Sequence, residues 1–160
     1  MSELTQQYTF SSGDRKLINR AIKTLEKQFM VAENAPKFLS PELTLNYLRL
    51  QLQGTDREHL LVLFLNNQNQ LIEAEKLFSG SINHVEVHPR VIARKALLNN
   101  ASSLILAHNH PSGNAIPSKA DRLITDSVVK CLSLFDIRIL DHIIIGSGNN
   151  YWSFAAQGSL

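Results

Sequence analysis

The sequence predicts an α/β domain in which helices cover both faces of one mixed β-sheet. Segments whose apolar residues recur at helical spacing alternate with short apolar runs of strand length, in the order helix, hairpin, helix, strand, helix and further strands. Turn residues or helix-capping patterns separate these segments. An alternation of this kind is typical of a sheet packed between two layers of helices. The apolar share of 44% is ordinary for a globular protein and is sufficient for a core.

Residues 1–37 are expected to form a helical extension that precedes the main domain. Residues 1–12 are polar and predict an irregular start. Gly13 and Asp14 then precede a helix to about Met30 that has one apolar face. The segment Ala32–Lys37 has the composition of a linker.

Residues 38–160 are expected to form the main domain. Ser40-Pro41-Glu42 combine a capping residue, a proline at the first helical position and an acid in the first turn, and the helix that they begin ends near Gly54. The other predicted elements are a hairpin of Leu60–Leu65 and Leu71–Phe78, a helix from Pro89 to about Asn99, the strand Ser103–Ala107, a helix from Ser118 to about Phe135, and the strands Arg138–Ile145 and Tyr151–Phe154.

Two histidines and an aspartate in the segment AHNHPSGNAIPSKAD have the spacing of a metal site. His108 and His110 follow the buried strand Ser103–Ala107, and because side chains alternate along an extended chain, both imidazoles can point to one ion. Ser118 is a capping residue, so Asp121 falls in the first helical turn, where the helix macrodipole favours its negative charge. Three protein ligands with an open fourth position are the arrangement of a catalytic zinc site. The donor set of two imidazoles and a carboxylate also admits other metals.

These residues belong to a longer pattern that resembles a known family. His108, His110, Ser118 and Asp121 match the spacing of the JAMM motif of the MPN-domain metalloproteases. The flanking sequence resembles the RadC family of bacterial proteins in five motifs, which are AHNHPSG, PSKAD, LFSGSI (Leu77–Ile82), VHPR (Val87–Arg90) and LDHIIIG (Leu140–Gly146). The likeness runs from about Phe38 to the C-terminus, and it is specific because the motifs occur in the family's order.

The chain departs from the family pattern in two respects. Val91 stands where the family usually has a glutamate after the VHPR motif, a position outside the metal motif. The longer RadC proteins also carry a helix-hairpin-helix module, and no segment of this sequence resembles one. The sequence therefore resembles the short form of the family.

The resemblance implies the MPN fold, a three-layer α/β/α sandwich similar to the cytidine deaminases, with zinc as the metal. It also implies a general-base glutamate at the start of a strand upstream of the histidines, for which Glu58, Glu73 and Glu75 are candidates. Glu58 leads into the apolar run His59–Leu65 and is the preferred candidate. Glu73 and Glu75 share one face of the hairpin's second strand, and a solvated strand face explains them well.

The resemblance assigns a chemical role to each of these residues. Zinc lowers the pKa of a bound water to about 7, and Glu58 would take that water's proton and pass it to the leaving amine. The Ser118 hydroxyl is the family's candidate donor to the developing oxyanion, although a helix N-cap explains Ser118 equally well. His142 is interpreted as a core histidine or as a support for a metal ligand, and Asp141 as a residue that could orient a metal-bound imidazole.

Composition narrows the setting in which the protein acts. The single cysteine, Cys131, cannot form an internal disulfide, which favours a cytoplasmic location. It also argues against a zinc deaminase, whose signature contains a Pro-Cys-x-x-Cys segment. The sequence contains no apolar run long enough for a transmembrane helix, and its N-terminus lacks the features of a signal peptide, so no membrane association is expected.

Three functions are compatible with these observations. The preferred one is a zinc-dependent metallohydrolase of peptide or isopeptide bonds with a peptide or protein substrate. The second is a DNA-repair-associated accessory protein that binds DNA. It would use a basic stripe on the first helix, formed by Lys16, Arg20, Lys23 and Lys27. The third is a noncatalytic interaction scaffold.

The candidate metal ligands and the net charge of the chain favour the first of these functions over the other two. The intact set of ligands argues against a scaffold. The net charge of only +2 and the interruption of the basic stripe by Glu26 argue against nucleic acid as the main partner. The sequence specifies neither a cleavage site nor an oligomeric state.

Overall fold

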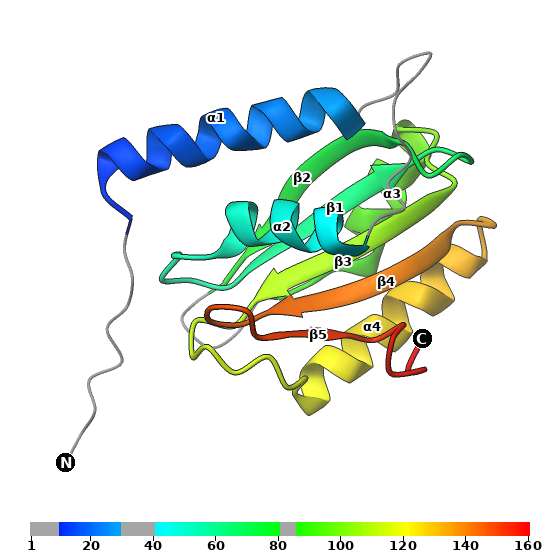
Figure 1. The fold of residues 1–160 in the computed structure, drawn as a ribbon. Helices are drawn as coiled ribbons and strands as arrows, with labels where there is room; N and C mark the ends of the chain where they lie inside the picture. Colours follow the sequence, from blue (N-terminus) through cyan, green and yellow to red (C-terminus); the bar gives the residue numbers. More distant parts are fainter. Residues whose placement is uncertain (1–9, 30–40, 81–85) are drawn as a thin grey trace.

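The structure is a computed structural model that describes residues 10–29, 41–80 and 86–160 (Figure 1). The described ranges contain four helices and five strands: α1 (Ser12–Phe29), α2 (Pro41–Leu52), β1 (His59–Leu65), β2 (Leu71–Ser79), α3 (Pro89–Leu98), β3 (Ser103–Asn109), α4 (Lys119–Ser133), β4 (Arg138–Ile145) and β5 (Tyr151–Ser153). All predicted helices and strands occur, with ends that differ by a few residues. The predicted linker Ala32–Lys37 lies outside the described residues.

The five strands form one mixed sheet in the order β2-β1-β3-β4-β5. The β1–β2, β1–β3 and β4–β5 pairs are antiparallel, whereas β3 and β4 are parallel. The two parallel strands are joined by α4, which crosses one face of the sheet between them (Figure 1). This connection matters for function because it brings the start of α4 close to the end of β3.

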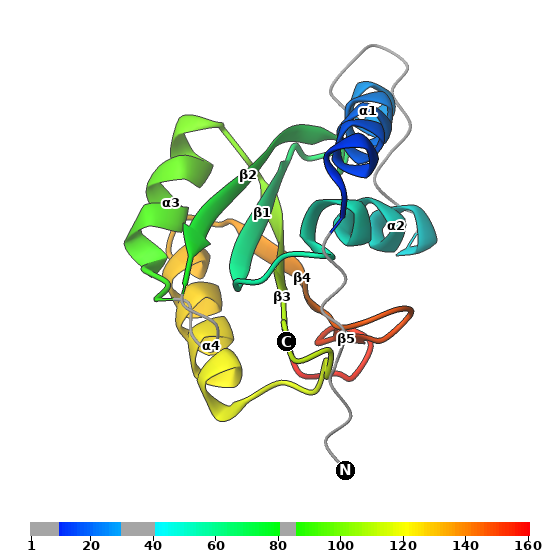
Figure 2. The same ribbon diagram turned by 90° about the vertical axis from the view of Figure 1, so that its left-hand side faces the viewer.

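Helices cover both faces of the sheet, which confirms the predicted three-layer α/β/α sandwich. Figure 2 shows α1 and α2 on one side of the sheet and α3 and α4 on the other. Alternate residues of β1 enter the two cores: Leu61 and Leu63 pack with the α2 side chains, and Val62 and Phe64 pack with those of α3 and α4. Since both faces are buried, the central strands read as continuous apolar runs rather than as polar–apolar alternation.

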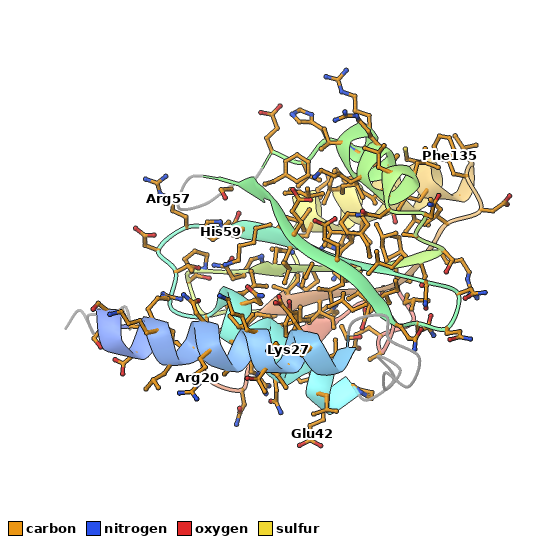
Figure 3. The ribbon with its side chains drawn as sticks, turned by 90° about the horizontal axis from the view of Figure 1, so that it is seen from above. Arg20, Lys27, Glu42, Arg57, His59 and Phe135 are labelled. Atoms are coloured by element: carbon orange, nitrogen blue, oxygen red, sulfur yellow. The ribbon has the colours of Figure 1, made fainter. Side chains whose placement is uncertain are left out.

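Helix α1 is attached to the domain through α2. The Tyr47 hydroxyl of α2 donates a hydrogen bond to Glu26 of α1, at 2.9 Å, and burial together with this carboxylate raises the pKa of Tyr47. Arg15 reaches the Gly54 carbonyl at the other end of α2, at 3.4 Å. All four residues of the basic stripe are exposed, and Arg20 points away from the sheet (Figure 3). The stripe is therefore a solvated helix face.

Candidate metal centre

Three side chains with metal-binding atoms converge where β3 ends and α4 begins. His108 lies on β3, His110 follows that strand directly, and Asp121 lies in the first turn of α4. The Nε2 atoms of His108 and His110 are 3.0 Å apart. The Asp121 carboxylate lies 3.2 Å from Nε2 of His108 and 3.3 Å from Nε2 of His110. An ion with four tetrahedral bonds of about 2.0–2.1 Å separates its ligand atoms by about 3.3 Å. The two imidazole nitrogens, and Nε2 of His108 with Oδ1 of Asp121, are separated by nearly this distance. One ligand atom from each of the three residues lies within 4.8 Å of the others.

The strand register explains why both histidines face α4. His108 pairs with Leu60 of β1, and Leu60 belongs to the core beneath α3 and α4. Paired residues on neighbouring strands share a face, and residue i+2 repeats that face, so His110 follows His108 to the same side. The two histidines therefore face α4 because of the strand alternation that the sequence predicts.

Ser118 holds Asp121, the third candidate ligand, in place. Its hydroxyl oxygen accepts a hydrogen bond from the Asp121 backbone N–H at 3.1 Å, which caps α4. In return, the backbone N–H and the hydroxyl of Ser118 both donate to Oδ2 of Asp121, each at 2.7 Å. This reciprocal capping box fixes the carboxylate before any ion binds.

His110 is fixed by the loop that follows it. Its Nδ1 lies 2.7 Å from the carbonyl oxygen of Asn114, which can only accept, so Nδ1 carries the proton and Nε2 is left to bind metal. The Gly113 carbonyl accepts hydrogen bonds from the Ser147 backbone N–H at 3.0 Å and from the Asn150 side chain at 2.9 Å. A side chain at Gly146 would overlap this carbonyl oxygen, so the close contact between loop and turn requires glycine there.

The charges of the cluster perturb its titration. Burial would raise the pKa of Asp121, but hydrogen bonds from His108 and His110 outweigh burial and hold the pKa well below its ordinary value. Burial would lower the pKa of His110, but the hydrogen bonds to Asp121 and Asn114 and the negative charges of Asp121 and Glu58 raise it instead. The carboxylate is thus ionised and available as a ligand, and a proton on His110 competes with a metal ion.

The three candidate ligands line a pocket of about 410 Å³. Glu58 and Ser118 line the same pocket, together with apolar side chains that include Leu60, Val87 and Ile124. Glu58 immediately precedes β1, and its backbone carbonyl accepts a hydrogen bond from Gly80 at 3.0 Å. Both residues that the sequence suggests for catalysis therefore lie beside the three candidate ligands.

The other two candidate glutamates lie elsewhere. Glu73 accepts a hydrogen bond from Asn99 at 2.7 Å, and Glu75 forms an ion pair with Lys95 of α3 at 2.7 Å. Both glutamates are half-buried, so the face that they share is only partly solvated. They do share one face as predicted, but Ile72 packs in the core beneath α3 and α4 rather than with Ala74, because an extra residue in β2 shifts the register near Leu71. The sequence does not reveal that α3 packs beside the two glutamates. Neither residue lines the pocket.

His142 contacts the candidate ligand His108, whereas Asp141 lies in other contacts. The His142 side chain is 1% exposed, and its Nε2 lies 2.8 Å from Nδ1 of His108. Burial holds the pKa of His142 well below its ordinary value, so the ring is neutral. Asp141 instead binds the Ser153 hydroxyl at 2.6 Å and the Ala155 backbone N–H at 3.0 Å, which fastens the C-terminal turn.

An irregularity in the β3–β4 register decides between these two residues. Leu104 pairs with Ile139, but the next residue, Ile105, pairs with Asp141, so β4 contains one extra residue at this point. The shift gives His142 the same face as His108. In unbroken register, Asp141 would have taken that face.

Two further residues of the site escaped the sequence analysis. Thr125 of α4 contacts the other nitrogen of His142, at 2.7 Å. Asn109 lies between the two histidines and points to the opposite face. Its side chain accepts from the His59 backbone N–H at 2.8 Å and donates to Thr55 and to the Arg57 carbonyl, at 2.9 and 2.8 Å. Asn109 thereby joins the metal strand to the segment that leads into Glu58. Its place in a buried strand, out of phase with the histidines, was the signal available in the sequence.

An α/β/α sandwich with two histidines and an aspartate gathered at the end of a central strand defines a domain of the JAB, or MPN, class. A family model described as "RadC-like JAB domain" matches residues 38–159. The chain is 51% identical over 148 residues to the UPF0758 protein YeeS of Escherichia coli (strain K12). The alignment covers 92% of this chain and 98% of YeeS. The chain belongs to the RadC family. In the described residues, no helix has both the length and the apolar character needed to cross a membrane.

Proposed function

We propose that this protein is a zinc-dependent metallohydrolase that cleaves peptide or isopeptide bonds. The observation that carries the proposal is the convergence of His108, His110 and Asp121 in one pocket with Glu58. The separation of the two Nε2 atoms, 3.0 Å, and that of His108 Nε2 from Oδ1 of Asp121, 3.2 Å, are close to the spacing of donor atoms around a zinc-sized ion. The family, which includes a JAB domain, supports metal-dependent hydrolysis as the class of reaction.

Zinc held by these ligands would lower the pKa of a water molecule to about 7 and polarise a substrate carbonyl. Glu58 is assigned as the general base, and its carboxylate accepts the proton that the attacking water loses. The same carboxyl group then delivers this proton to the leaving amine nitrogen, so that both products leave neutral at the broken bond. The position of Glu58 beside the ligands, and its influence on the pKa of His110, support this role.

Ser118 is assigned two compatible roles. Its hydroxyl donates to Asp121 in the resting site, and the same hydroxyl would turn toward the substrate's developing oxyanion. Asp121 stays in place during this rotation because the Ser118 backbone N–H continues to donate to the same oxygen, at 2.7 Å. The N-cap and oxyanion interpretations therefore do not exclude each other.

The competing functions receive less support. A DNA-binding function would rely on the basic stripe of α1, which is an exposed helix face that contributes no residue to the pocket of the candidate metal site. A scaffold would have no need for a complete set of ligands beside a carboxylate. We place the protein in the cytoplasm on the basis of its single cysteine.

The first experiment is metal analysis of the purified protein, followed by cleavage assays on a peptide pool. We expect about one zinc ion per chain, and loss of that zinc when His108 and His110 are both replaced by Ala. Full zinc retention in the double variant would overturn the site assignment.

The second experiment separates binding from turnover. Glu58→Gln should keep the zinc and reduce the cleavage rate by about a hundredfold to ten-thousandfold, because the amide cannot accept the proton. Glu73→Gln is the matched control, since this glutamate lies on β2 outside the pocket, and it should leave the rate nearly unchanged. Equal activity of Glu58→Gln and the wild type would remove Glu58 from the mechanism.

A further inference from the structure

We propose that Thr125 and His142 form a hydrogen-bond relay, a chain of hydrogen bonds with a fixed direction, that determines which ring nitrogen of His108 carries its proton. In this view both are positioning residues of the metal site, although neither contacts the ion. The inference concerns the site of the proposed function, but the relay can be tested in the metal-free protein.

The relay is a chain of three hydrogen bonds that begins and ends at metal-ligand residues. The Thr125 hydroxyl lies 2.6 Å from the backbone carbonyl oxygen of Asp121. The same hydroxyl lies 2.7 Å from Nδ1 of His142. Nε2 of His142 in turn lies 2.8 Å from Nδ1 of His108. Thr125 and His142 are each 1% exposed, so water does not compete for these bonds.

The protons of this chain can be placed by counting donors. A carbonyl oxygen only accepts, so the Thr125 hydroxyl donates its single proton to Asp121. The hydroxyl can then only accept from His142, whose Nδ1 must carry the proton. A neutral imidazole has one N–H, so Nε2 of His142 is the acceptor and Nδ1 of His108 is the donor.

The result is the tautomer that a metal ligand needs. With its proton on Nδ1, His108 has a lone pair on Nε2, which is the atom directed at His110 and Asp121. The other tautomer would place two lone pairs opposite each other between His108 and His142, and an N–H where the ion must bind. A buried polar group left without its partner costs about 1–3 kcal/mol. This cost favours the Nδ1–H form against the hydrogen bond that an Nε2–H of His108 would make to Asp121, 3.2 Å away, in the metal-free site.

The tautomer of His108 depends on contacts with other side chains, whereas that of His110 does not. The tautomer of His110 is fixed by a main-chain carbonyl, which a substitution does not remove. His142 is also held by Phe154, whose ring stacks on it with centroids 5.1 Å apart and planes 13° apart. Since Thr125 follows Asp121 by one helical turn, α4 supplies one ligand and sets the tautomer of another.

The test replaces Thr125 with valine, which has nearly the same shape and lacks the hydroxyl. The readout is the ¹H–¹⁵N spectrum of the imidazoles in metal-free protein, well above the ordinary histidine pKa of about 6.5. In the wild type, we expect protons on Nδ1 of both His108 and His142. In Thr125→Val, the proton of His142 is released to Nε2, and His108 should shift toward the Nε2–H form.

Zinc affinity, measured by competition with a chromogenic chelator, provides the second readout. We expect Thr125→Val to weaken affinity by about 10–100-fold, which is the usual effect of removing a residue that orients a metal ligand. Thr125→Ser retains the hydroxyl and should remain close to the wild type. Ser127→Ala is the matched control, because Ser127 forms the same kind of bond to the carbonyl four residues earlier, at 2.8 Å, but lies outside the relay.

The two readouts separate the relay from the proposed function. A wild-type spectrum with the His108 proton on Nε2 would overturn the relay, and it can be recorded whether or not the valine variant folds. Unchanged tautomers and affinity in Thr125→Val would also overturn it. If the wild type bound no zinc, the proposed function would fail, while the spectrum would still decide whether the relay exists.

Discussion

Replacing Asn109 with alanine would test how the metal strand is connected to the general base. Asn109 is 4% exposed, and its side chain makes three hydrogen bonds, two to the segment before β1 and one to His59, the first residue of β1. Each intramolecular hydrogen bond contributes about 1 kcal/mol net, so Asn109→Ala should lower the free energy of unfolding by about 3 kcal/mol. Urea denaturation of the metal-free protein measures this loss, provided that the dependence on denaturant is unchanged.

The same variant should affect turnover more than metal binding. The rings of His108 and His110 are held on the opposite face by His142 and Asn114, so zinc affinity should stay near that of the wild type. Turnover should fall because the segment that positions Glu58 has lost its anchor. Asn67→Ala, in an exposed turn, is the control. A loss of stability below about 1 kcal/mol, or a loss of zinc equal to the loss of activity, would refute this reasoning.

Three further predictions follow from the site and its surroundings. Gly146→Ala should destabilise the protein by about 1–3 kcal/mol and weaken zinc binding, because the new methyl group displaces the Gly113 carbonyl. Thermal unfolding measures the loss of stability, and competition with a chelator measures the loss of zinc affinity. In the metal-free protein, the pKa of His110 is raised above its value in the unfolded chain, which is about 6.5. Protonation of His110 therefore stabilises the fold at any pH below this unfolded-state pKa, and the stabilisation is lost as the pH rises through the pKa of His110 in the folded protein. Because zinc displaces that proton, zinc affinity should increase over the same range, and a pH-independent affinity would contradict the prediction. Changing the basic stripe of α1 to Gln should leave zinc content and cleavage unchanged, and tight salt-sensitive DNA binding lost in that variant would instead favour the accessory function.

The parts of the site that depend on local sequence were predictable. Alternation along β3 placed His108 and His110 on one face, and the Ser118–Asp121 spacing predicted the helix start that holds the third ligand. Both features are set within a few residues of the ligands themselves. The preference for Glu58 over Glu73 rests mostly on the family resemblance, and its role as general base stays a prediction, although Glu58 lines the same pocket as the two histidines and Asp121.

The parts that depend on pairing between distant segments were not predictable. The contact between His142 and His108 requires one extra residue in β4 opposite the Leu104–Ile105 step, and the apolar composition of both strands is compatible with either register. The pairing of Glu75 with Lys95 depends in the same way on where α3 packs. Periodicity identifies the face of a strand, but tertiary packing decides what covers that face.

The three candidate ligands share one structural property. The protein holds each of them through an atom other than the one that we assign to the metal. Nδ1 of His108 binds His142, Nδ1 of His110 binds the Asn114 carbonyl, and the Asp121 carboxylate receives the Ser118 N–H. These contacts fix the direction of every donor in the absence of an ion, so little side-chain entropy remains to be lost on binding. They come from three different segments, namely β4, the loop after β3 and the start of α4. A displacement of any one segment would therefore misdirect one candidate ligand while the other two stay in place. Substitutions of the supporting residues should accordingly weaken zinc binding partially, whereas substitutions of the candidate ligands should abolish it.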